Sequence, residues 1–221
     1  MKKVIYMACV VAVMTTAQAK PMDQAKLSIH KNNIKVWTYQ NAQNPVFLYK
    51  AETTFDVPIE KAVSLILDVD HAVKWVPYMG SVKVLSRDDK KGEFQLYMVL
   101  DFPFPLKDRD LVVQGKMTKD SQGIISIKNK AIDKNILKNP DYVRLNHYEG
   151  DWTFQKLGSN KVKVSTSGYA NPEGSIPLKF VNMFYCQLSD RKDCYLQKSF
   201  LCLHCHIKDR QMELHLHSEK F

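Results

Sequence analysis

The densest group of metal-ligating side chains lies close to the C-terminus. The run from Cys202 to His206 contains two thiols and two imidazoles, and His215 and His217 follow it. Because Zn²⁺ accepts thiolate and imidazole ligands, this spacing could hold a zinc ion. A single C-x-x-C pair without a second pair at standard spacing also occurs in tails whose cysteines are oxidised or unpaired. We therefore predict no metal site and keep zinc binding by this tail as the alternative.

The sequence shows no pattern of residues that would perform covalent or acid–base catalysis. It contains no G-x-S-x-G segment, no Ser/His/Asp order that stands out and no paired carboxylates at a suggestive spacing. Such chemistry needs a nucleophile with a base, or an acid–base pair, held in one cavity. We predict that the protein is not an enzyme and that it uses no cofactor.

One pair of opposite charges follows a turn rich in proline. Arg109 and Asp110 come shortly after Phe102-Pro103-Phe104-Pro105, where two prolines must end one strand and set a rigid turn. The pair could contact a polar ligand directly. A structural ion pair is the more common role of such residues, so we predict that Arg109 and Asp110 form a salt bridge that anchors the turn.

The elements that must position these residues are mostly strands. Apolar and polar side chains alternate along short segments that end at turn-forming residues such as Asp88–Gly92 and Asp120–Gly123. The predicted strands are Ile34–Tyr39, Val46–Phe55, Val82–Ser86, Glu93–Leu100, Asp110–Thr118, Ile124–Ala131, Tyr142–Gln155 and Lys161–Ala170. The last six form a long antiparallel meander.

Helical spacing of apolar residues appears at three places. Asp56 as the cap and Pro58 in the first turn begin a helix that ends near Asp68, and His71–Trp75 predicts a second, short helix. After Asn171-Pro172-Glu173-Gly174, apolar side chains that include Phe180 and Phe184 recur at helical spacing. The layout is α+β, with a curved antiparallel sheet that can wrap around the late helix.

The N-terminal residues are typical of a secretory signal peptide. Lys2 and Lys3 precede a short apolar run, and Ala17-Gln18-Ala19 forms a small-x-small cleavage site, so the mature chain is expected to begin at Lys20. We expect a periplasmic or secreted protein that is monomeric. Its formal net charge of +9 is spread along the chain, which favours solubility over a nucleic-acid partner but would suit transient contact with a membrane surface.

The segment Phe102–Val112 resembles the most recognisable motif of START (StAR-related lipid-transfer) domains, which have the helix-grip fold. Further marks of this family follow in the same order, namely Trp75-Val76-Pro77, Val143-Arg144-Leu145, Gly150-Asp151-Trp152 and Asn171–Pro177. The resemblance covers about Ile34 to Phe184. Together with the signal segment and the change of composition after residue 188, it divides the chain into a signal peptide at 1–19, a START-like lipid-binding domain at 20–188, and a divergent Cys/His-rich tail at 189–221.

What the resemblance implies for function is a lipid or sterol-like ligand held between the sheet and the late helix, for carriage or sequestration in the cell envelope. Strand parity and the family layout predict the residues that line this cavity: Phe94, Leu96, Tyr97, Met98, Leu100, Leu111, Val113, Met117, His147, Trp152, Phe154, Phe180 and Phe184. The same side chains would also suit a solid core. The alternative function is a helix-grip enzyme, a cyclase or hydrolase that acts on a bulky apolar substrate.

Two departures from the family pattern affect this expectation. Sterol-binding relatives commonly keep a buried arginine at the position of Gly115, which argues against cholesterol and leaves Tyr97, Arg144 and His147 as polar candidates. The late helix is also interrupted at Ser189–Asp193 by polar residues, so it could be shortened or replaced.

Overall fold

The computed structural model describes residues 25–41, 44–76, 78–102, 104–133, 139–171, 173–174 and 176. The predicted signal peptide, the late helix with Phe180 and Phe184, and the Cys/His-rich tail lie outside the described residues. Within the described part, no helix has the length and apolar character needed to cross a membrane.

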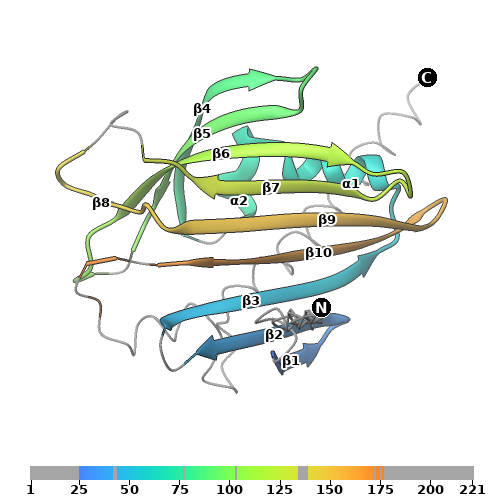
Figure 1. Cartoon of the computed structure of the whole chain (residues 1–221), viewed down its shortest axis with the longest axis horizontal. Helices are drawn as coiled ribbons and strands as arrows, with labels where there is room; N and C mark the ends of the chain where they lie inside the picture. The colour runs from blue at the N-terminus through green and yellow to red at the C-terminus, as the bar shows by residue number, and fades with distance from the viewer. Residues whose placement is uncertain are drawn as a thin grey trace, which may run out of the picture.

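A largely antiparallel sheet forms most of the described chain (Figure 1). Its strand order is β1-β2-β3-β10-β9-β7-β6-β5-β4, and β8 pairs with β6. The strands are β1 (Lys26–Lys31), β2 (Ile34–Asn41), β3 (Asn44–Phe55), β4 (Met79–Asp88), β5 (Glu93–Leu100), β6 (Arg109–Lys119), β7 (Ile125–Ala131), β8 (Val143–Arg144), β9 (Tyr148–Gly158) and β10 (Lys161–Ala170). The predicted meander and the α+β fold are confirmed.

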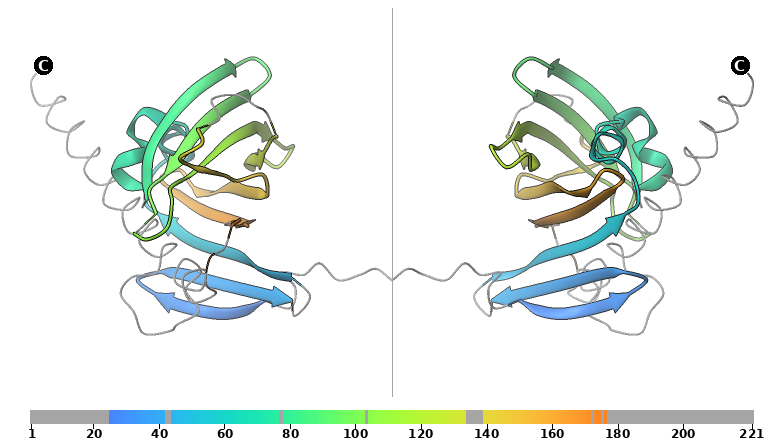
Figure 2. Two further views of the ribbon diagram at one scale, coloured as in Figure 1. Left: turned by 90° about the vertical axis from the view of Figure 1, so that its left-hand side faces the viewer. Right: turned by 90° about the vertical axis from the view of Figure 1, so that its right-hand side faces the viewer.

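Alternation of side chains explains which face of each strand is covered. On β3, Ala51, Thr53 and Phe55 are buried, whereas Glu52 and Thr54 between them are only half-buried. Successive side chains of a strand point to opposite faces, so one face of the sheet carries the core. Figure 2 shows that the sheet curves strongly and that the helices lie on its concave face.

Three helical segments follow β3. They are α1 (Ile59–Ile66), the 3₁₀ turn η2 (Val69–His71) and α2 (Ala72–Trp75). Helix α1 buries Ile59, Ala62, Val63 and Leu65 on one side, which is the spacing of an amphipathic helix. These side chains pack in the main core with residues of the concave face that include Phe154 and Val162.

The predicted start of α1 was wrong in its capping residue. Pro58 is the N-cap, no side chain caps the helix, and Asp56 is exposed two residues earlier. The carbonyl of Pro58 accepts hydrogen bonds from the backbone N–H groups of Lys61 and Ala62 at 3.1 and 3.3 Å. Proline suits this place because the first helical N–H groups have no partner within the helix.

Two strand predictions also need correction. Strand β1 was not predicted, because its short polar sequence at an edge gives little alternation; four of its six residues are exposed. The predicted strand Tyr142–Gln155 is two elements, β8 and β9. Between them, Leu145 N–H donates to the Asp110 carbonyl at 2.8 Å, and the His147 carbonyl accepts from Asn171 N–H at 2.8 Å. These bonds turn the chain away from a continuous ladder.

The two outermost strands of the described sheet have irregular ladders. The β1–β2 register shifts between Leu27 and Ile29. The β4–β5 register shifts twice, between Met79 and Ser81 and between Val84 and Ser86. Such β-bulges bend a strand and increase its twist.

Candidate functional site

A cavity of about 290 Å³ lies between the concave face of the sheet and the helical segment that follows β3. Strands β3 to β7, β9 and β10 contribute one wall, and α1, η2 and α2 contribute residues such as Ile66, Val69 and Trp75 to the other. Most of the lining is apolar or aromatic. A concave site with few polar groups suits an apolar small molecule.

Eight of the side chains predicted from strand parity line this cavity. They come from three strands, and they are Phe94, Leu96, Met98 and Leu100 on β5, Leu111, Val113 and Met117 on β6, and Trp152 on β9. The cross-strand pairs Met98–Leu111 and Leu96–Val113 bring two of these sets together.

Three of the predicted residues lie elsewhere. Phe154 is fully buried in the core among Ile127 and Val164, beneath α1, and it does not reach the cavity. Tyr97 alternates with Leu96 and Met98, so it points to the convex face of the sheet. The side chain of His147 is 68% exposed and contacts Glu173. Strand parity identifies a face but not the depth at which a residue sits.

Several cavity residues were not predicted from the sequence. Aromatic side chains prominent among them are Tyr49, Trp75, Tyr78, Phe102, Tyr148 and Tyr169. A signal existed for Tyr49, because it shares the parity of Ala51, Thr53 and Phe55 on β3. The residues on loops and on the short helices show no such alternation, so their direction could not be deduced.

Neutral polar groups stand on the sheet side of the cavity. Tyr49 and Thr166 line it from neighbouring strands, and burial raises the pKa of the Tyr49 phenol above its ordinary value. The Asn129 amide nitrogen donates to the Gly150 carbonyl at 2.8 Å. The β7–β9 ladder pairs Ile127 with Trp152 and then Lys130 with Glu149, so the Asn129 side chain bridges the interval between these two pairs.

Two tryptophans meet at the cavity wall. The rings of Trp75 and Trp152 form an edge-to-face contact, with centroids 6.4 Å apart and an angle of 76° between the planes. Such a contact stabilises aromatic packing beyond the area it buries. Trp75 is 6% exposed, and its Nε1 has no hydrogen-bond partner among the described residues.

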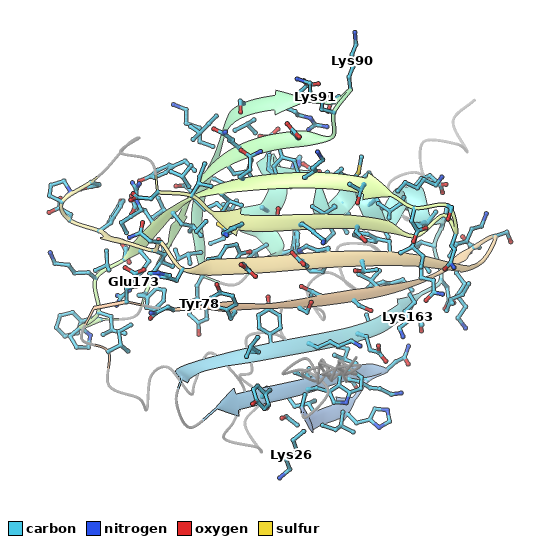
Figure 3. All side chains as sticks on the ribbon, in the orientation of Figure 1. Lys26, Tyr78, Lys90, Lys91, Lys163 and Glu173 are labelled. Carbon is cyan, nitrogen blue, oxygen red and sulfur yellow. The ribbon has the colours of Figure 1, made fainter. Side chains whose placement is uncertain are left out.

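Charged side chains reach the cavity only at the end near the β4–β5 hairpin, as far as the structure describes it. Arg87 Nε donates to Asp89 Oδ1 at 2.6 Å, and Lys116 Nζ lies 2.9 Å from Glu93 Oε1. Lys90 and Lys91 project from the tip of this hairpin (Figure 3). These ion pairs are exposed, so each contributes little to stability.

The predicted salt bridge between Arg109 and Asp110 is not the pair that forms. Asp110 is 1% exposed, and its carboxylate accepts two hydrogen bonds from Arg144, from Nε and Nη2, each at 2.8 Å. Tyr97 Oη donates to the same carboxylate at 2.9 Å. The hydrogen bond to Asp110 raises the pKa of Arg144. Burial and then the hydrogen bond of Tyr97 to Asp110 raise the pKa of Tyr97 to about 12.

This cluster joins three strands on the convex face. Asp110 and Arg144 face each other across the short parallel ladder of β6 and β8, and Tyr97 stands on β5. Neighbouring side chains of a strand point to opposite faces, so Leu111 lines the cavity while the Asp110 side chain lies on the convex face. Asp110 therefore links β5, β6 and β8, and the partner of its carboxylate is Arg144 instead of the predicted Arg109.

Arg109 contacts the residues on either side of the proline-rich turn. Its guanidinium donates to the Lys107 carbonyl and lies over the Phe102 ring, 4.4 Å from the ring centroid. Burial lowers the pKa of Arg109. The Phe104–Pro105 peptide bond in this turn is cis, and Phe104 is 96% exposed. The prediction that Arg109 is a loop anchor agrees with these contacts.

Glu173 ties the segment after β10 to the segment before β9. Its Oε1 accepts from Asn146 N–H at 2.9 Å and lies 3.0 Å from His147 Nδ1. In Figure 3, Glu173 and Tyr78 both lie in the half of the sheet that carries β8. Within the described chain, no three His, Cys, Asp or Glu side chains cluster as metal ligands would; the Cys/His-rich tail lies outside it.

The sequence is similar to proteins of a known family. The START domain family matches residues 16–188. Among sequence relatives, an uncharacterized Pseudomonas aeruginosa protein is 24% identical over 72% of this chain and 78% of its own length. The phosphatidylcholine transfer protein of Bos taurus is also 24% identical, over 71% of this chain and 75% of its own length.

Solved structures show the same fold. A STAR-related lipid transfer protein from Xanthomonas axonopodis superposes with a TM-score of 0.71 and 21% identity, covering 83% of this chain and 98% of that one. Human StAR-related lipid transfer protein 5 gives a TM-score of 0.73 with 16% identity, covering 85% of this chain and 88% of that one. Together with the match over residues 16–188, these findings show that the chain belongs to the START domain family.

Proposed function

We propose that this protein binds a lipid or another hydrophobic small molecule in the cavity on the concave face, for carriage or sequestration in the cell envelope. The proposal depends on the lining of the cavity. Apolar and aromatic side chains from seven strands and the helical segment surround an open volume on the concave face, where a solid core would have no such space. Burial of apolar ligand surface against such walls is favourable by about 25 cal/mol per Å².

The relatives support the same class of ligand. One is named a phosphatidylcholine transfer protein and others are named StAR-related lipid transfer proteins. Export through the N-terminal signal segment would place the protein in the periplasm, where lipid in transit between membranes needs shelter from water. A transient contact with a membrane surface is part of this proposal.

Two substitutions on β5 test whether the cavity is the binding site. Leu96→Trp and Met98→Trp would fill space that a lipid chain occupies, so binding of a fluorescent fatty acid should fall while the melting temperature changes little. In a solid core the same insertions would overpack their neighbours and cost typically 1–3 kcal/mol. A large drop in melting temperature, with no lipid binding by the wild type, would refute the proposal.

A matched control is available on the next strand. Gln114 on β6 alternates with the cavity residue Val113, so its side chain points to the opposite face. There its amide accepts from Gln95 Nε2 at 2.7 Å. Gln114→Trp should therefore leave binding unchanged, which separates loss of cavity space from the general effect of adding a large ring to the sheet.

Mass spectrometry distinguishes carriage from catalysis. Under native conditions, protein purified from an exporting host should carry a lipid whose mass is the same after extraction and after prolonged incubation. Conversion of that ligand into a product by the purified protein would favour the alternative, an enzyme of the helix-grip fold.

A further inference from the structure

A row of small residues crosses the concave face of the sheet. Gly115 on β6 pairs with Asn129 on β7, and the Asn129 amide reaches the Gly150 carbonyl of β9 at 2.8 Å. Gly150 pairs in turn with Gly168 on β10. Three of the four positions carry no side chain. At Gly115 and Gly150 this leaves a hollow down to the backbone, whereas at Gly168 the Glu149 carbonyl lies where a Cβ would be.

Aromatic rings fill part of this hollow. Phe94 on β5 is the direct cross-strand partner of Gly115, and its ring occupies the space where a Cβ of residue 115 would lie. The phenol of Tyr148 covers Gly150 in the same way. Phe94 and Tyr148 both line the cavity. Each glycine thus provides the seat for a ring that forms part of the cavity wall.

We propose that Phe94, seated on Gly115, sets the depth of the cavity and so selects slender, chain-like apolar ligands over ligands with bulky rings. This inference rests on the proposed function, because it assumes that the cavity holds the ligand. The selection is steric: while the ring covers Gly115, a ligand meets Phe94 instead of the backbone beneath it.

Truncation of Phe94 would open the hollow at Gly115. The wall would then retreat to the Gly115 backbone and to the Asn129 amide, whose Oδ1 lies 2.8 Å from the Cβ position of residue 115. Each methylene equivalent of a ligand that gains room in an apolar site strengthens binding by about fourfold. A ligand group that needs the space of two methylenes should therefore gain about 15-fold in affinity.

Two fluorescent fatty acids provide the test, one with a linear polyene chain and one with a terminal pyrene ring. Their dissociation constants are measured on protein stripped of copurifying lipid. Phe94→Ala should raise the affinity for the pyrene probe relative to the polyene probe by about 15-fold, and Phe94→Leu should give a smaller change in the same direction. The Leu variant provides the measurement if the Ala variant does not fold.

The matched control is Phe154→Leu. Phe154 lies on the same face of β9 as the cavity residue Trp152, but it is fully buried in the core and does not line the cavity. Its truncation should therefore leave the ratio of the two affinities unchanged. An unchanged ratio in both Phe94 variants, with a wild type that binds the polyene probe, would overturn this inference alone. A wild type that binds neither probe would instead refute the proposed function.

Discussion

Replacement of Asp110 by alanine should destabilise the fold more than removal of an exposed ion pair of the sheet. The Asp110 carboxylate is 1% exposed and the Arg144 side chain is 10% exposed, so Asp110→Ala leaves a guanidinium in the convex face without its main partner. Removing one member of a buried pair costs about 3–5 kcal/mol. Because domains are stable by about 5–15 kcal/mol, the variant should still fold at 25 °C.

The assay is urea unfolding followed by circular dichroism, with thermal unfolding beside it. A loss of 3 kcal/mol corresponds to a fall in melting temperature of about 6–12 °C for a domain of this size. The matched control is Glu93→Ala. The Lys116–Glu93 pair has nearly the same distance, 2.9 Å against 2.8 Å, but its side chains are 55% and 38% exposed, so its loss should cost at most about 1 kcal/mol.

A double-mutant cycle identifies the partner. If the cost arises from the loss of the carboxylate that Arg144 binds, the variant with both Asp110→Ala and Arg144→Ala should be less destabilised than the two single variants together, by about 0.5–3 kcal/mol. Additive effects would show that Asp110 and Arg144 act independently. An Asp110→Ala protein as stable as Glu93→Ala would refute the reasoning from burial.

Three other outcomes are expected. Because the pKa of Tyr97 is raised from 10.0 to about 12, the unfolded chain loses its proton first as the pH rises, so the free energy of unfolding should fall between these values; Tyr97→Phe should reduce that fall in alkaline urea titrations. Gly115→Ala should cost about 1–3 kcal/mol in urea unfolding, because its Cβ overlaps the Phe94 ring, and a Phe94→Ala background should relieve most of that cost. Amino-terminal sequencing of the exported protein should begin at Lys20, and retention of Met1 in a membrane fraction would contradict the signal-peptide assignment.

The sheet could be predicted from the sequence because each strand shows its alternation of apolar and polar residues within a short segment. Alternation over a few residues identified the meander, and it assigned Leu96 and Met98 to the concave face. Parity alone placed Phe154 there too, but it could not show that α1 covers this position while the cavity lies elsewhere on the same face. Depth depends on what packs against the sheet, and that is not encoded in a single strand.

The Asp110–Arg144 pair was missed for a different reason. The two residues are 34 positions apart, and their contact depends on a two-residue parallel bridge between β6 and β8. Such a bridge leaves no periodic signal in the sequence. Adjacent opposite charges at Arg109 and Asp110 suggested the nearer pairing, although neighbouring residues of a strand point to opposite faces and cannot easily meet.

The irregular outer strands bear on how the protein behaves in a crowded compartment. An open sheet ends in strands whose backbone groups could template the addition of another chain, which leads to edge-to-edge polymerisation. The register shifts at Leu27–Ile29 on β1 and at Met79–Ser81 and Val84–Ser86 on β4 twist these strands away from the flat geometry that a growing fibril requires. The curvature that encloses the cavity therefore also works against self-association through the two edges.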